Sequence, residues 1–243
     1  MVNTENTLDQ HDDEAGQEAA ENPHDGERLL LPIGHYVGAR HRAPDATEAA
    51  QEFSQQVRRG AAFHDLTSQQ FTVWTLAHGS PEAIQNEVAW RRQSVEELAK
   101  LTGLVGVASL VEGLIGMRLL VEIAPGTGPA LDFAKTHRVV PLMLGLGNTA
   151  DEPGLFDIGF LNQPILQVTH PIYDLWQWSA MDDTLWATCE SAADVARRGN
   201  YADPDSADPD KLLTGFLGSL HALLVTNAAC LDIAFRLDHP QAG

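Results

Sequence analysis

One pattern of residues occurs twice in this chain, about a hundred positions apart, and it limits the architectures that the sequence can form. The first copy is FHDLTSQQFTVWTLAHG, residues 63–79. Its T-x-x-Q pair, Thr67 and Gln70, predicts a helix start at which each side chain bonds the main chain of the other residue. Apolar residues then recur at helical spacing towards Gly79, which predicts a half-buried helix.

The second copy lies 102 positions later, in the segment VTHPIYDLWQW. A threonine, an aromatic residue, an aliphatic residue and a tryptophan recur in one order, as Thr67, Phe71, Val73 and Trp74 and again as Thr169, Tyr173, Leu175 and Trp176. Pro171 falls in the first turn of the second helix, where its missing N–H costs no hydrogen bond.

Two further segments match on either side of this pair. Upstream, at an offset of 109, Pro32 aligns with Pro141. Downstream, at an offset of 104, residues 119–121 align with 223–225, each expected to close an apolar helix. Three matches in one order indicate an internal duplication and predict a tandem architecture. The alternative is two unrelated halves that share only common helix patterns.

Composition sets the class of protein. The chain has 243 residues, 44% of them apolar, which is enough for two small domains with separate cores. Its longest apolar stretches are too short or too charged for the roughly 20 residues of a membrane span, so no membrane partner is expected. No signal peptide opens the chain, and the two cysteines cannot form a disulfide framework, so we expect a cytoplasmic location.

The net charge restricts the partners. There are 15 basic and 34 acidic residues, a formal charge of −19, and nine of the acids lie in the first 28 residues. Nonspecific affinity for nucleic acid comes from Lys and Arg on phosphates, so this balance disfavours a simple DNA-binding protein without excluding one. The sequence does not decide whether the protein forms an oligomer.

The order of elements predicts an α+β fold of two tandem winged-helix-like domains, each a β-hairpin plus three helices. In the first half we expect strands at 29–37 and 53–63, helices from Thr67, Ser94 and Val107, and a closing strand. In the second we expect strands at 139–146 and 156–168 and helices at 169–180, 182–198 and 211–233. The expected boundaries are a disordered acidic tail at 1–27, a domain at 28–125, a linker at 126–137, a domain at 138–236 and a disordered tail at 237–243.

The segments RRGAAFHDLTSQQFTVWTLAHG, SVEELAKLTG and VASLVEGLIGMRLLVEI follow one another as strand, capped helix, short helix and apolar helix. This order resembles the PqqD-like winged-helix modules, which bind leader peptides in the biosynthesis of ribosomally made, modified peptides. The resemblance covers residues 28–123 and, more faintly, the second half. A long loop at 40–49 and a tandem copy depart from the family pattern.

By resemblance, an extended peptide would add to a sheet edge at 56–63 and lie against the helix that follows. The implied peptide-binding residues are Gln56, Val57, Arg58, Arg59, Ala61, Phe63, Leu110, Leu114 and Met117. Arg58 and Arg59 would flank the groove and suit an acidic peptide. The alternative for these two arginines is a solvated pair that protects an edge strand from aggregation.

The second function to consider is a winged-helix transcriptional regulator, in which a helix enters the major groove. That helix would be 108–120, but it is apolar nearly all round and its one basic residue, Arg118, lies at its end. The arginines that could contact DNA are Arg40, Arg42, Arg91, Arg92 and Arg118.

Catalytic signatures are not found in the sequence. The segment GLGNTA, 145–150, fits a dinucleotide-binding motif, but a turn follows where that motif requires a helix. No histidines have the spacing of a zinc site, and both Cys189 and Cys230 are expected on apolar helix faces as inert thiols. We therefore expect no enzymatic activity, no catalytic or metal-ligating residues and no cofactor.

Overall fold

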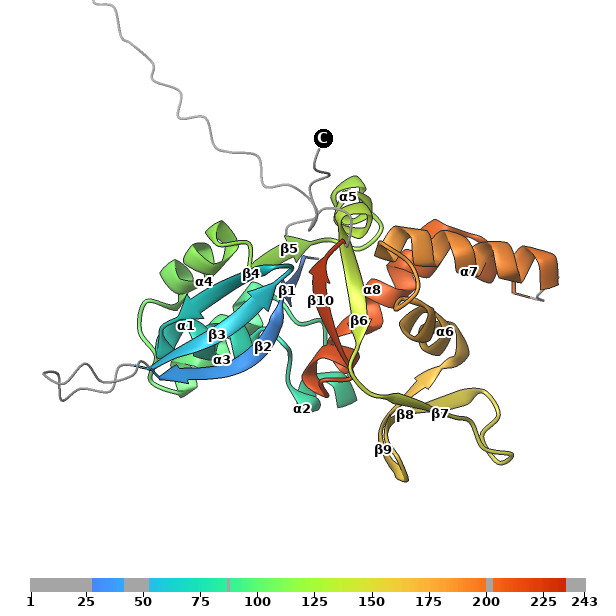
Figure 1. Ribbon diagram of the computed structural model, residues 1–243, viewed down its shortest axis with the longest axis horizontal. Coiled ribbons are helices and arrows are strands. Elements are labelled where there is room, and N and C mark those ends of the chain that lie inside the picture. Colours follow the sequence, from blue (N-terminus) through green and yellow to red (C-terminus); the bar gives the residue numbers. More distant parts are fainter. Residues whose placement is uncertain (1–27, 42–52, 87, 200–202, 235–243) are drawn as a thin grey trace, which may run out of the picture.

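The computed structural model describes residues 28–41, 53–86, 88–199 and 203–234, and shows a mixed α+β protein (Figure 1). The two expected tails and most of the 40–49 loop lie outside these residues. The first half contains the elements β1 Leu29–Pro32, β2 His35–His41, β3 Phe53–Arg59, β4 Ala62–Leu66, α1 Ser68–Leu76, α2 Pro81–Gln85, α3 Arg92–Leu101, α4 Val107–Gly116 and β5 Leu120–Ile123.

The remaining elements are α5 Gly128–Thr136, β6 His137–Pro141, β7 Leu144–Gly147, β8 Leu155–Phe160, β9 Gln163–Thr169, α6 His170–Trp178, α7 Leu185–Gly199, the 3₁₀ helix η2 Pro204–Ala207, α8 Pro209–Val225 and β10 Ala229–Ile233. The segment 126–137, expected to be a linker, therefore contains helix α5, which buries Ala130, Phe133 and Ala134. No helix among the described residues is long and apolar enough to cross a membrane.

Each half contains two small antiparallel sheets. In the first half, β1 pairs with β5, and β2, β3 and β4 form a three-stranded sheet in that order. In the second half, β6 pairs with β10, and β7, β8 and β9 form the other three-stranded sheet. The expected two-stranded hairpins are therefore wrong in detail: a turn at Gly60, where φ is 57°, divides the segment 53–63 into β3 and β4.

The strand registers relate the halves position by position. Pro32 pairs with Leu120 at one end of the first ladder, and Pro141 pairs with Ala229 at the same end of the second, so both strands are offset by 109. Bulges before Gly38 and before Gly147 interrupt β2 and β7 at this same offset. The matches at 67–76 and 169–178 start helices that follow the third strand of each three-stranded sheet.

The alignment of residues 119–121 with 223–225 is wrong. The first segment crosses into strand β5, whereas the second lies inside helix α8. The expected helix at 211–233 is likewise too long, because α8 ends at Val225 and β10 follows. The two helix ends that do correspond are those of α4 and α8, each followed by a residue in the left-handed conformation, Arg118 and Asn227.

The capping interactions of the first helix are as predicted. The amide of Gln70 donates to the hydroxyl of Thr67 at 3.2 Å, and the amide of Thr67 donates to the Gln70 side chain at 3.0 Å. Ser94, in contrast, is not the cap of α3, which begins at Arg92. The Ser94 hydroxyl accepts a hydrogen bond from the amide of Arg91, and Leu101, the last residue of α3, is exposed.

The ribbon of β1 and β5 lies between the two hydrophobic cores. Leu30 and Leu120 pack into a core formed by α1, α3 and α4, whereas Leu29 and Leu31 pack into a second core with α6 and α8. A strand buried on both faces needs a continuous apolar run, which explains the sequence Leu29 to Leu31. The strands β6 and β10 form a second ribbon. It contacts the first just after β1, where the amide of Gly34 donates to the carbonyl of Leu231 at 2.7 Å.

Candidate binding site between the halves

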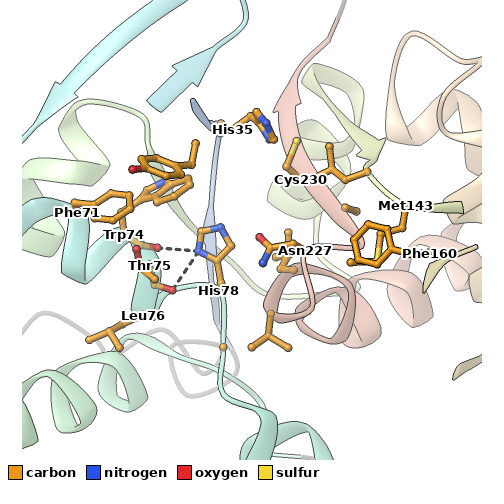
Figure 2. Close-up of a pocket in the computed structure, with 17 residues that line it drawn as sticks. His35, Phe71, Trp74, Thr75, Leu76, His78, Met143, Phe160, Asn227 and Cys230 are labelled. Carbon is orange, nitrogen blue, oxygen red and sulfur yellow. Dashed lines mark hydrogen bonds between the residues drawn. The ribbon is translucent and has the colours of Figure 1, made fainter. Parts of the chain in front are cut away.

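A cavity of about 580 Å³ lies between the two halves of the chain (Figure 2). One wall comes from α1 and the start of β2. The other comes from the segment before β7, the end of β8, the end of α8 and the start of β10. The side chains that define it best are Tyr36, Phe71, Trp74, His78, Met143, Phe160, Asn227 and Cys230.

Aromatic rings in contact form the first wall. The ring of Phe71 lies 4.8 Å from that of Tyr36 and 6.0 Å from that of Trp74. The indole N–H of Trp74 donates to the carbonyl of Ile33 at 3.2 Å, and the Tyr36 hydroxyl donates to the side chain of Gln55 at 2.7 Å. These bonds satisfy the polar ends of both side chains and hold their apolar surfaces in place.

The second wall is mainly apolar, with Asn227 as its polar side chain, and parts of it are exposed to solvent. Leu142 and Phe160 line the cavity, with exposed fractions of 36% and 53%. Cys230 also lines it and lies on strand β10, not on a helix as expected. Burial raises the pKa of its thiol to about 12, so the thiol stays protonated and does not act as a nucleophile.

His78 is the main polar group in the first wall. Its Nδ1 lies 3.0 Å from the carbonyl oxygen of Trp74 and 3.2 Å from that of Thr75 (Figure 2). Since a carbonyl can only accept, Nδ1 carries the hydrogen and Nε2 keeps a lone pair. Burial lowers the pKa of His78 to about 4, so the ring is neutral at physiological pH.

The cavity is therefore neutral, mainly apolar and supplied with few polar groups. Burial, and then the nearby Arg58, lower the pKa of His35, which adds no charge to the lining at neutral pH. Such a site suits an aromatic or aliphatic group that carries one hydrogen-bond donor. Among the described residues no cluster of His, Cys, Asp or Glu could hold a metal ion.

Open strand edges border the cavity. Within the described part of the chain, β2 pairs only with β3, and β7 pairs only with β8. His35 and Tyr36, at the start of β2, and Leu142 and Met143, just before β7, line the cavity. Each three-stranded sheet thus presents a strand with one unpaired side next to an apolar hollow.

The sheet edge expected at 56–63 is wrong. Strand β3, with Gln56, Val57, Arg58 and Arg59, is the central strand, so its main chain is paired on both sides. Ala61 is exposed in the following turn.

Phe63 lies on β4, the true outer strand on that side, where 56% of its side chain is exposed. The wrong edge follows from the turn at Gly60, which places the segment on two strands instead of one.

The three helix residues expected to form the peptide pocket contribute to the core instead. Leu114 is fully buried, and Leu110 and Met117 pack half-buried against the core around Trp74. The two arginines expected beside them face the second half. Arg58 lies 3.9 Å from the buried carboxylate of Asp232, so this arginine has an acidic partner in the second half.

The arginines considered for DNA differ in their surroundings. Arg92 makes two hydrogen bonds to Glu122, at 2.9 and 2.7 Å, and one to Glu112 at 2.5 Å, and these raise its pKa. Its guanidinium is therefore already neutralised by carboxylates. Arg40 bonds Gln56 at 3.0 Å, Arg91 is exposed, and Arg42 lies outside the described residues.

The cavity itself was missed from the sequence. The spacing of Phe71 and Trp74 indicated a buried helix face but not the half that would cover it. The exposed apolar residues of the second wall follow no period that separates them from core residues. Comparison of the chain with protein-family models, with curated proteins and with solved structures gave no match.

Proposed function

We propose that this protein is a non-catalytic module that binds an extended segment of a peptide or protein, with an apolar side chain of the partner in the cavity between the halves. The observation that carries this proposal is the position of that cavity beside the open edges of β2 and β7. A peptide that adds to a sheet edge gains main-chain hydrogen bonds, and a neighbouring pocket selects its side chain.

The neutral lining supports an apolar anchor. A neutral histidine and a protonated thiol leave no fixed charge to be desolvated by an incoming aliphatic or aromatic group. The exposed side of Phe160 and the aromatic wall at Phe71 would then be covered on binding, and burying such rings is a main source of interface energy.

We also propose that the halves are winged-helix-like domains related by internal duplication. The shared offset of 109 between the two-stranded ladders, the matching bulges and the two helices starting after Thr67 and Thr169 support this origin. A three-stranded sheet followed by helices also fits the resemblance to PqqD-like modules. Under that resemblance, the partner is a precursor peptide with its leader sequence.

The alternative function is DNA-binding regulation by a winged helix. It has less support, because Arg92 is engaged by two carboxylates and helix α4 buries Val107, Val111 and Leu114. Base readout requires polar side chains on an accessible helix face.

Selection from a library of extended peptides, followed by titration, tests the proposal. Replacing Phe160 or Met143 with aspartate should weaken binding of a selected peptide by tenfold or more, because a charge would enter the apolar lining. Phe63→Asp is the matched control, since Phe63 is equally exposed on β4, away from the lining residues. Equal losses in all three variants would contradict the site.

The same protein should be titrated against duplex DNA at two salt concentrations. Peptide binding predicts little affinity for DNA, whereas a regulator would bind tightly and lose affinity steeply as salt rises. Tight, sequence-selective binding would replace the proposed function with the alternative.

A further inference from the structure

A second pocket, of about 650 Å³, lies between α4, β5 and the start of β6, and differs in charge from the cavity described above. Its walls include Ile33, Ile115 and Leu120, and its polar side chains are Arg59, Arg118, Thr136 and His137. No acidic side chain lines it, although the chain as a whole carries a formal charge of −19.

The two pockets occupy corresponding places in the two halves. Ile33 follows β1 as Leu142 follows β6, and Leu120 begins β5 as Ala229 begins β10. Arg59 and Phe160 are the last residues of the central strands β3 and β8. The first residue of each pair lines the basic pocket, and the second lines the apolar cavity.

Arg118 stands at a position that does not favour arginine. It follows α4 with φ at 58°, and Asn227 follows α8 with φ at 55°. In both places the next amide donates back to the helix, Leu119 to Leu114 at 2.9 Å and Ala228 to Leu223 at 2.8 Å. Glycine and asparagine are the usual residues at such a helix end, because a larger side chain is strained there. A strained arginine at this position suggests that its side chain has a function.

Arg59 supplies a second observation. Its Nε is buried and has no hydrogen-bond partner among the described residues, and neither Arg59 nor Arg118 forms an ion pair within them. A buried donor without an acceptor is costly, so an acceptor from a ligand would relieve this cost.

His137 adds a polar group without a charge. Its Nδ1 lies 3.1 Å from the carbonyl oxygen of Phe133, and burial lowers its pKa. The positive charge of the pocket therefore comes from the two arginines. Asp232 is nearby but lies outside the lining; one carboxylate oxygen accepts from the amide of Gly60 at 2.7 Å, and the other lies 3.9 Å from Arg58 and has no hydrogen-bond partner among the described residues.

We propose that this basic pocket binds an oxyanion, a carboxylate or a phosphate, carried by a ligand whose remaining part is apolar. Two guanidinium groups match the geometry of such an anion, and the aliphatic side chains around them suit an alkyl or aryl group. The site is separate from the cavity of the proposed function and does not depend on that function.

Thermal unfolding of the full chain tests this with hexanoate, hexyl phosphate and hexanol, which share one alkyl chain and differ in head group. At constant ionic strength, at least one anion should raise the Tm with concentration more than hexanol does. The anion with the larger effect identifies the preferred head group. Equal shifts with all three compounds would overturn the proposal.

The variant Arg118→Asn introduces the residue found at the corresponding helix end. Because asparagine tolerates the left-handed conformation, the Tm without ligand should be retained or raised, while anion affinity should fall about tenfold or more. Arg91→Gln, a change to an exposed arginine outside the lining, should leave anion affinity unchanged. Retained affinity in Arg118→Asn would overturn the proposal.

A direct measurement does not depend on any variant. In the ¹H–¹⁵N spectrum of the natural protein, the preferred anion should shift the Nε–H signal of Arg59, while hexanol should leave it in place. A signal that does not respond to either anion would also overturn the proposal.

Discussion

The carboxylate of Asp232 accepts a hydrogen bond from the main-chain N–H of Gly60 at 2.7 Å, across 172 positions of the chain. Asp232 lies on β10 with only 1% of its surface exposed, and Gly60 forms the turn between β3 and β4. The interaction therefore joins the last strand of the second half to the three-stranded sheet of the first.

Asp232→Ala should destabilise the protein by about 2 to 4 kcal/mol, because it leaves the buried Gly60 donor without an acceptor and Arg58 without a counter-charge. Asp232→Asn keeps an acceptor oxygen and should cost less. Urea unfolding followed by circular dichroism measures both. A loss below about 0.5 kcal/mol for alanine would show that this link contributes little.

Trp74 and Trp176 are expected to have equivalent roles. Both are buried, and their indole N–H groups donate to the carbonyls of Ile33 at 3.2 Å and of Ala228 at 2.9 Å. Each alanine substitution should destabilise by about 3 to 5 kcal/mol, the range for a large buried side chain. Substitution of either tryptophan by phenylalanine should destabilise less, because the ring still fills the core. It leaves the carbonyl without its donor, which should cost about 1 to 3 kcal/mol. Unfolding curves for the four variants provide the comparison.

Two buried histidines should make stability fall as the pH is lowered. Burial lowers the pKa of both His78 and His221 to about 4, against 6.5 in the unfolded chain. Below pH 6.5 these histidines bind protons in the unfolded state but remain neutral in the folded state. The free energy of unfolding therefore falls as the pH is lowered from 6.5 to about 4. The contribution is about 3 kcal/mol for each histidine.

Urea unfolding at a series of pH values measures this dependence. Replacing either histidine with glutamine should reduce the slope of stability against pH by about one proton. The lowered pKa values of His35, His64 and His137 leave a residual slope in the double variant. An unchanged slope would mean that neither ring is neutral in the fold.

Gly145 should not tolerate a side chain. A Cβ placed there would lie 2.2 Å from the hydroxyl oxygen of Tyr173 and 2.9 Å from its ring carbon. Gly145→Ala should therefore cost about 1 to 3 kcal/mol, and Tyr173→Phe in the same chain should recover part of it. Gly154→Ala is the control, because nothing lies within 4 Å of its Cβ position. A double-mutant cycle without coupling would contradict this packing.

Local signals in the sequence predicted a substantial part of the fold. The capping pair Thr67 and Gln70 was found because its hydrogen bonds form within one helical turn. Strand β5 was predicted from its apolar run before Pro125. Strand β10 was missed because the left-handed residue before it is Asn227, so neither glycine nor proline marks the end of α8 in an apolar sequence.

The candidate sites could not be predicted in the same way, because they depend on contacts between the halves. The strand pairing around β3 is determined by the turn at Gly60 and by the pairing of β1 with β5 instead of with β3. Arg58 and Arg59 were predicted either to flank a peptide groove or to form a solvated pair. Their surroundings come from residues far away in the chain, Asp232 and His137. Periodicity describes one element at a time and contains no information about such pairings.

The pairing of β1 with β5 also determines when this protein can fold during synthesis. The ladder between β1 and β5 pairs Leu29 with Ile123, so it can form only after Ile123 has been synthesised. The first half therefore cannot be completed until nearly all of it has left the ribosome. Even then Leu29 and Leu31 have no covering layer, because that face is buried by α6 and α8. A nascent chain that stops after the first half would expose the apolar face of β1, which favours aggregation. Translation of the second half covers this face.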